Sequence, residues 1–217
     1  MNACIPRKEN VAKQRIVDEF LYGKSLPEGY LLNILPSYWD NKPNGVRYDP
    51  DKNEIHLKIN NEPYKFQLLK MLGEGGFGSV WLYYDKSNQV SLALKKTNTE
   101  QEFAISNALL KSGCDVLRVR GLGLDTMEGK FLFIMEQAEG DLSFLMDSLK
   151  RPVSIKFILN VVEQIRRQVL CIGRLNQRFL YADVKLKNIL YKCDDPNNLN
   201  GIRVFLDRKS TRLNSSH

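Results

Sequence analysis

The chain has 217 residues, of which 43% are hydrophobic and 26% are charged, and its formal net charge is +7 at pH 7. This composition is ordinary for a globular protein and excludes an intrinsically disordered chain. No apolar run approaches the roughly 18 to 20 residues of a membrane-spanning helix, and no basic block with interleaved aromatic residues indicates a nucleic-acid partner.

Residues 1–63 are predicted to form an N-terminal extension with one helix and a short hairpin. Apolar residues at helical spacing indicate the helix: Ile16, Val17, Phe20 and Leu21. Two strands, 46–48 and 55–59, are predicted on either side of a DPDKN turn. Nothing in this segment indicates chemistry, so we expect it to serve in packing or docking.

A glycine-rich segment follows a predicted strand at 64–72. It reads GEGGFG and comprises Gly73, Glu74, Gly75, Gly76, Phe77 and Gly78. Dinucleotide-binding and Walker A loops lead into a helix, whereas β-branched and aromatic residues typical of a strand follow here. The pattern therefore favours a hairpin whose glycines allow the backbone to lie over phosphates, with an ordinary glycine-rich hairpin as the alternative.

The next predicted strand, 92–95, places Ala93 and Lys95 on one face because side chains alternate along a strand. A small residue beside a lysine leaves room for a base and lets the amine reach phosphates. A helix is predicted at 99–111, and Glu102 is its favoured partner for Lys95, with Glu100 as the alternative.

Further strands are predicted at 116–124 and 130–136, and helices at 141–149 and from Ser154 over about 19 residues. The loop after the second helix carries Asp183, Lys185 and Asn188 at the spacing D-x-K-x-x-N. Such a loop could orient a hydroxyl, neutralise a phosphate and hold a divalent cation. Two strands, 189–191 and 202–206, are predicted to follow it.

Taken in order, these motifs resemble the serine/threonine protein kinase family. The glycine loop with Val80 matches G-x-G-x-x-G-x-V, the strand with Lys95 matches the family's A-x-K strand, and D-x-K-x-x-N matches its catalytic loop. The resemblance covers residues 64 to about 206. It implies an α+β fold of two lobes: a small lobe at 64–137, with an antiparallel sheet and one helix, and an incomplete helical large lobe at 138–206.

The resemblance also implies ATP and Mg²⁺ as cofactors and transfer of the γ-phosphate to serine or threonine hydroxyls of a protein substrate. Asp183 and Lys185 are the implied catalytic residues, and Asn188 and Asp207 the implied metal ligands. Residues implied to bind ATP, besides the six of the glycine loop, are Val80, Ala93, Lys95, Glu102, Met135, Glu136, Ala138 and Leu190.

Three departures from the family pattern qualify this expectation. Tyr181 and Ala182 stand where the family has His and Arg, and no Phe-Gly follows Asp207. Residues 207–217 read DRKSTRLNSSH, the in-frame translation of a common sequencing adapter, and are expected to be an artefactual tail. We therefore expect a truncated, inactive kinase fragment; the alternative is a pseudokinase or ATP-binding regulatory module.

The four cysteines, Cys4, Cys114, Cys171 and Cys193, are widely spaced and contain no C-x-x-C pair. This spacing argues against a zinc site and against a disulfide framework. The N-terminus shows no apolar signal sequence. The sequence therefore predicts reduced cysteines and an intracellular, cytoplasmic location.

Overall fold

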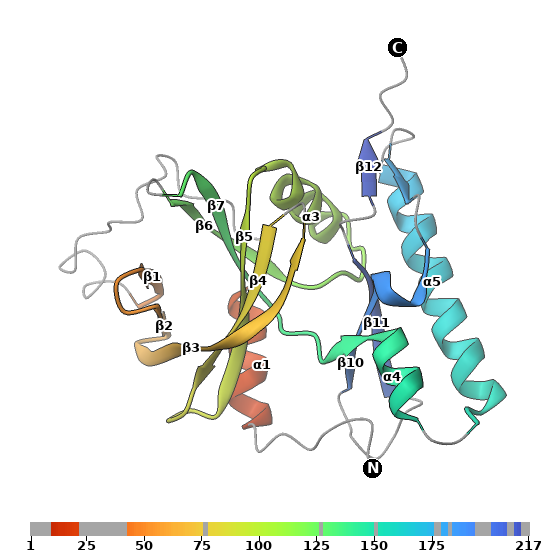
Figure 1. Ribbon diagram of the computed structural model, residues 1–217, viewed down its shortest axis with the longest axis horizontal. Coiled ribbons are helices and arrows are strands. Elements are labelled where there is room, and N and C mark those ends of the chain that lie inside the picture. Colours follow the sequence, from red (N-terminus) through yellow and green to blue (C-terminus); the bar gives the residue numbers. More distant parts are fainter. Residues whose placement is uncertain are drawn as a thin grey trace. The chain divides into compact units, whose positions relative to one another are not determined.

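The computed structural model describes residues 10–21, 43–75, 78–125, 128–149, 152–175, 179–181, 184–193, 201–207 and 211–213. The chain divides into two compact units. We call Lys8–Asn107 with Arg118–Gln137 the sheet unit, and Met1–Arg7, Ala108–Leu117 and Ala138–His217 the helical unit. Each is described by itself below (Figure 1).

The sheet unit is built on a seven-stranded antiparallel sheet of order β1-β2-β3-β4-β5-β7-β6. The strands are β1 Gly45–Asp49, β2 Glu54–Ile59, β3 Glu62–Gly75, β4 Gly78–Asp85, β5 Val90–Thr97, β6 Val119–Asp125 and β7 Lys130–Met135. Two helices accompany them, α1 Val11–Phe20 and α3 Gln101–Lys111, the latter continuing into the helical unit. The predicted strands 46–48 and 55–59 are confirmed. The predicted helix 99–111 is present but begins at Gln101, and the strand predicted from 116 begins at Val119.

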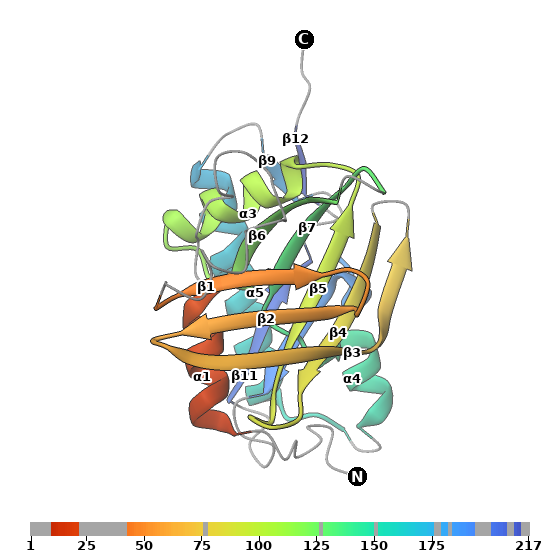
Figure 2. The same cartoon turned by 90° about the vertical axis from the view of Figure 1, so that its left-hand side faces the viewer.

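The sheet bends sharply along β3. The first part of this strand, Glu62–Gln67, pairs with β2, and the part from Gln67 to Gly75 pairs with β4. The register shifts between Leu68 and Lys70, and such bulges bend a strand. As a result β1 and β2 lie across β4 and β5 (Figure 2), and side chains from both parts of the sheet enter one core.

This core contains residues from α1 as well as from the strands. Its buried members are Val17, Phe20, Leu21, Tyr48, Ile55, Leu57, Ile59, Tyr64, Phe66, Tyr83, Val90, Leu92, Leu94, Leu122, Leu132 and Ile134. Arg120 packs against this core: its guanidinium lies 4.0 Å from the Phe20 ring centroid and donates to the Phe20 carbonyl at 3.3 Å. Burial lowers the pKa of Arg120 to about 10. The N-terminal extension is thus part of the packing of the sheet unit, and its boundary at residue 63 stays a prediction.

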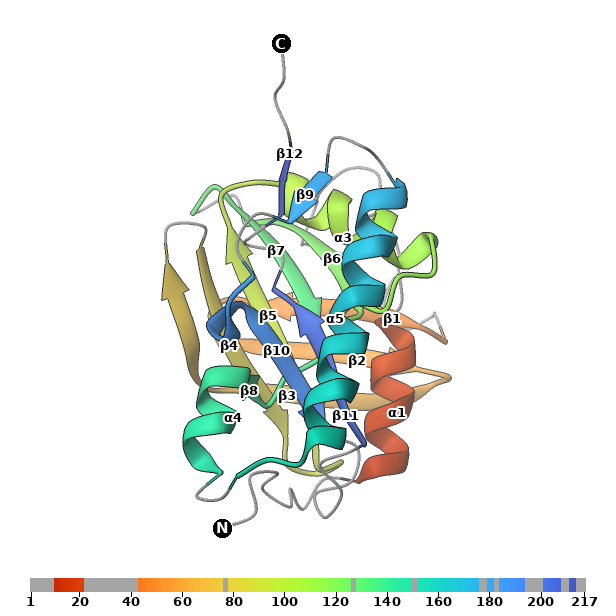
Figure 3. The same cartoon turned by 90° about the vertical axis from the view of Figure 1, so that its right-hand side faces the viewer.

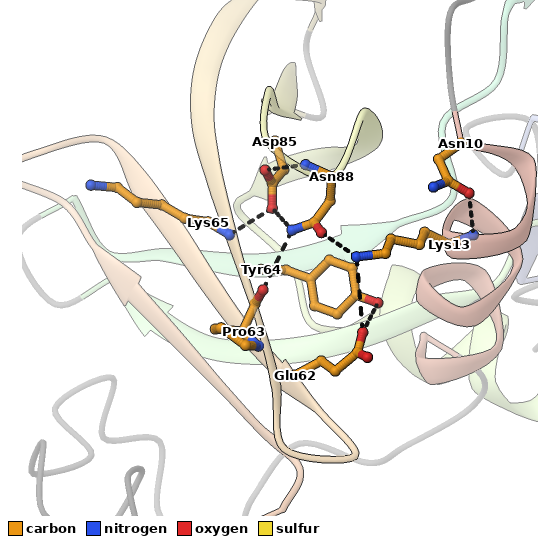
Figure 4. Close-up of polar contacts among 8 residues, drawn as sticks. All are labelled: Asn10, Lys13, Glu62, Pro63, Tyr64, Lys65, Asp85 and Asn88. Carbon is orange, nitrogen blue, oxygen red and sulfur yellow. Dashed lines mark hydrogen bonds and ion pairs between the residues drawn. The ribbon is translucent and has the colours of Figure 1, made fainter.

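Polar contacts fix α1 to the turn between β4 and β5. The buried Asp85 carboxylate accepts from the Lys65 amide at 2.8 Å and from the Asn88 side-chain amide at 2.7 Å. Lys13 in turn donates to the Asn88 side-chain oxygen at 2.7 Å (Figure 4). Gln14 pairs with both the backbone N–H and C=O of Ser91, at 2.8 and 2.9 Å. Ser91 lies beyond the end of β7, so Gln14 satisfies backbone groups that the neighbouring strand does not reach.

The helical unit contains a three-stranded sheet of order β11-β10-β8. Its strands are β8 Gly140–Asp141, β10 Ile189–Cys193 and β11 Ile202–Leu206, and its helices are α4 Leu142–Ser148 and α5 Ile155–Leu175. A short 3₁₀ helix, η1 Leu186–Asn188, precedes β10, and β9 Phe179–Tyr181 pairs with β12 Thr211–Leu213. α5 packs along β11 (Figure 3). In the described part of the chain no helix combines the length and the apolar character that crossing a membrane requires.

A disulfide joins Cys114 to Cys171, with their Cα atoms 5.8 Å apart, and Cys193 is disulfide-bonded as well. The prediction of reduced cysteines was therefore wrong. Cys114 and Cys171 are separated by 57 positions in the sequence, yet the segment after α3 and the helix α5 belong to the same compact unit. Sequence spacing does not reveal such a long-range approach. The predicted cytoplasmic location loses the support that it drew from free thiols.

Candidate functional site

The Lys95 ammonium group on β5 forms an ion pair with Glu102 on α3. Both side chains are shielded from solvent, with exposed fractions of 7% and 13%. Glu102 lies in the first turn of α3, and the Ser106 hydroxyl donates to its backbone carbonyl at 2.6 Å. The choice of Glu102 over Glu100 as the partner of Lys95 agrees with this contact.

Register across the sheet places four of the predicted ATP-binding residues on one face. Val80 on β4 lies opposite Lys95, and Met135 on β7 lies opposite Ala93. Cross-strand partners project from the same face, and so do alternate residues of one strand. Val80, Ala93, Lys95 and Met135 therefore line one surface, whereas Leu92 and Leu94 enter the core on the other.

The contact that anchors α3 to this face was not predicted from the sequence. The rings of Phe103 and Phe133 stack with centroids 5.1 Å apart. Phe133 is the cross-strand partner of Lys95, and Phe103 follows Glu102 directly. The stack therefore fixes the first turn of α3 beside the lysine. An aromatic residue next to the candidate glutamate was the available signal, but its partner strand could not be identified from spacing.

The glycine loop is a hairpin, as predicted, with Gly73 paired to Val80 and Gly75 to Gly78. Gly78 has φ +127°, and a Cβ there would lie 1.9 Å from the Lys96 carbonyl oxygen. A Cβ at Gly73 or Gly75 would meet no described atom within 4 Å. Close packing against Lys96 thus explains why residue 78 is a glycine. Gly73 and Gly75 instead leave their backbone accessible, and Glu74 between them is exposed. Gly76 and Phe77 lie outside the described residues.

The segment after β7 is held by Glu136, which is almost fully buried. Its amide donates to the Arg118 carbonyl at 3.0 Å, and its carboxylate accepts from the Arg118 amide at 2.9 Å. Because the Glu136 N–H is used in this way, it is not available to donate to the edge of a base. Ala138 follows in the helical unit and is half-buried.

In the helical unit the two candidate metal ligands are neighbours. The Asp207 amide donates to the Asn188 carbonyl at 2.7 Å, which extends the pairing of β10 with β11 by one step. Lys185 is exposed, and its carbonyl accepts from the Asn188 amide at 2.8 Å in η1. Leu190 on β10 is half-buried. Asp183, and Ala182 before it, lie outside the described residues.

The site residues thus fall into two groups, one in each unit. Val80, Ala93, Lys95, Glu102 and Met135 come together in the sheet unit, and Lys185, Asn188, Leu190 and Asp207 in the helical unit. Within the described residues no cluster of three or more His, Cys, Asp or Glu side chains suits a metal ion. Asn188 and Asp207, the metal ligands that the resemblance implies, carry amide and carboxylate oxygens, which suit Mg²⁺.

No family model matches this chain. Among curated proteins it is similar to cyclin-dependent kinase 11B of Mus musculus, with 29% identity over 137 residues, or 58% of this chain and 17% of that protein. It is also similar to the serine/threonine-protein kinase PITSLRE of Drosophila melanogaster, at 29% over 58% of this chain and 14% of that protein. The serine/threonine-protein kinase SULU of Caenorhabditis elegans is 27% identical over 67% of this chain and 15% of its own length.

The chain therefore spans less than a fifth of the length of each of these three relatives. The mixed architecture, with its large antiparallel sheet and few helices, is compatible with the small lobe of a kinase. At a coarse level, the similarity to named serine/threonine kinases supports a protein kinase family for this chain.

Proposed function

We propose that this chain is part of an ATP-dependent protein kinase that phosphorylates serine or threonine hydroxyls. The observation that carries the proposal is the shielded ion pair of Lys95 with Glu102, on the same sheet face as Val80 and Ala93. A lysine held in this way presents its charge at a fixed point beside the glycine hairpin. That arrangement suits a lysine that binds the phosphates of a nucleotide, and a purely structural salt bridge would not require it.

Each residue has a role that its chemistry supports. Lys95 neutralises the α- and β-phosphates, and the backbone of Gly73 and Gly75 lies over the phosphate chain. The face with Ala93 and Met135 contacts the adenine, and the backbone of Glu136 meets its polar edge. In the helical unit, the Leu190 side chain and the Ala138 backbone are the groups that suit the same kinds of contact.

In the transfer step, the substrate hydroxyl oxygen bonds to the γ-phosphorus and the bond to the β-phosphate oxygen breaks, which releases ADP. Asp183 takes the hydroxyl proton, and Lys185 offsets charge on the moving phosphoryl group. Asn188 and Asp207 would hold Mg²⁺, which supplies neutralising charge to the phosphates when bound.

The experiment that tests the proposal is a titration of the chain with ATP, with and without Mg²⁺, followed by a radiolabel transfer assay on protein substrates. Saturable ATP binding that Mg²⁺ strengthens is expected. Asp183→Ala should keep this binding, and in a longer chain that includes the whole kinase region it should abolish transfer. A chain that binds neither ATP nor Mg²⁺·ATP contradicts the proposal.

A second function, nucleotide binding without transfer, is favoured by one specific observation. In the family's catalytic loop an arginine precedes the catalytic aspartate, and Ala182 replaces it in this chain. If a longer chain that includes the whole kinase region binds Mg²⁺·ATP but transfers phosphate to no protein or small-molecule substrate, that result would support this regulatory module over an active kinase.

A further inference from the structure

Two glutamines on α5 pair with the outer edge of β11. Gln164 donates to the Ile202 carbonyl at 2.9 Å and accepts from the Val204 amide at 3.0 Å. Gln168 donates to the Val204 carbonyl and accepts from the Leu206 amide at 3.0 Å. Both side chains are buried, with exposed fractions of 8% and 2%.

The repeat has a simple geometric origin. Residues four apart on a helix are separated by about 6 Å along its axis. Residues two apart on a strand are separated by about 6.6 Å. Glutamines spaced i and i+4 can therefore each meet the next outward-facing backbone groups of a strand. The amides replace a neighbouring strand on the side of β11 that β10 does not occupy.

The two glutamines differ in what lies next to them. Gln168 accepts a hydrogen bond from the backbone of Leu206, the last residue of β11, and Asp207 follows Leu206 directly. The Asp207 amide then donates to the Asn188 carbonyl, so the two candidate metal ligands meet one residue beyond the contact with Gln168. Gln164 makes the same kind of contact one helical turn earlier, away from this point.

We propose that Gln168 is a positioning residue for the metal site: by holding Leu206 it fixes where Asp207 and Asn188 stand relative to each other. The inference rests on the proposed function, because that function assigns the metal to these two residues and takes Asp207, the first residue of the adapter-like segment, as the family's metal-binding aspartate. Outer contacts that orient metal ligands typically account for about 10- to 100-fold in metal affinity.

Gln168→Met tests the proposal, with Gln164→Met as a matched control. Each change keeps the side-chain length and leaves one N–H and one C=O of β11 without a partner, so both should destabilise the unit to a similar degree. Mn²⁺ affinity in the presence of a non-hydrolysable ATP analogue is measured by electron paramagnetic resonance. Amide hydrogen exchange is measured at Val204 and Leu206.

We expect faster exchange at Leu206 and about tenfold or more weaker Mn²⁺ binding in Gln168→Met only. Gln164→Met should speed exchange at Val204 and keep Mn²⁺ affinity unchanged. Equal Mn²⁺ affinities in the two variants, whether both lowered or both unchanged, would overturn the positioning role. An unaltered chain that binds the nucleotide analogue but no Mn²⁺ overturns it too, whereas a chain that binds neither overturns the proposed function itself.

Discussion

Lys95 and Glu102 form an ion pair in which Glu102 contributes only one of its carboxylate oxygens; the other, Oε2, is buried and has no hydrogen-bond partner among the described residues. The pair therefore depends strongly on the single contact. Removing one member leaves the opposite charge shielded from water, which costs more than the contact itself contributes.

Lys95→Met should weaken ATP binding and lower the free energy of unfolding by about 3 kcal/mol or more. Glu102→Gln should weaken ATP binding less, because the amine remains but is no longer held. Isothermal titration and urea denaturation measure the two effects. Lys96→Met is the control, since Lys96 projects from the opposite face and pairs with Glu128 at 2.9 Å. If Lys96→Met weakens ATP binding as much as Lys95→Met, the assignment of Lys95 is wrong.

The glycines of the hairpin should respond differently to alanine. Gly78→Ala places a Cβ against the Lys96 carbonyl at a positive φ, so it should destabilise the protein by about 1–3 kcal/mol. Gly75→Ala has open space and should change stability by no more than about 0.5 kcal/mol, yet lower ATP affinity by crowding the backbone. Thermal unfolding and ATP titration of both variants separate the roles. Unchanged ATP affinity in Gly75→Ala would argue against the phosphate-binding hairpin.

Local patterns predicted the sheet unit well. The alternation in 92–95 gave the two faces of β5 correctly, and the short apolar segments at 55–59 and 130–136 became β2 and β7 with small shifts. Glu102 was also identified as the partner of Lys95, because it shares a helical face with the apolar residues Ile105 and Leu109. Each of these inferences depends on residues close together in the chain.

Contacts between distant segments were not predictable in the same way. Nothing in the sequence indicates that Phe20 meets Arg120 one hundred positions later, or that Gln14 completes the backbone pairing of Ser91. The disulfide of Cys114 with Cys171 was missed for the same reason. A glutamine in a helix is ordinarily expected to face solvent, so Gln164 and Gln168 gave no sign of their contacts with β11.

The disulfide between Cys114 and Cys171 should contribute measurably to stability. It ties the segment after α3 to α5, and it closes a long loop, so its removal should cost about 2–4 kcal/mol. The double variant Cys114→Ser, Cys171→Ser should therefore unfold at a lower temperature than the oxidised parent. Reductant should lower the parent's transition but shift the double variant less.

Cys193→Ser serves as the control, because Cys193 belongs to another disulfide. This variant should keep the Cys114–Cys171 bridge in a non-reducing peptide map and remain sensitive to reductant. A peptide map of the oxidised parent that lacks the bridge would contradict the prediction.

Glu54 should make the protein sensitive to acid. The hydrogen bond from Lys65, whose Nζ is 2.9 Å away, is the largest influence and lowers the pKa of Glu54 from 4.5 to about 2. Because the folded-state pKa lies below the unfolded one, the stabilisation is complete above pH 4.5 and is lost as the pH falls towards 2. The Lys65 side chain is 56% exposed, and screening should limit the effect to about 1–2 kcal/mol.

Urea denaturation between pH 2.5 and 6 should show this loss of stability in the parent and not in Glu54→Gln. The exposed Glu163, changed to Gln, should leave the pH dependence nearly as it is, and an unchanged acid slope in Glu54→Gln would refute the assignment.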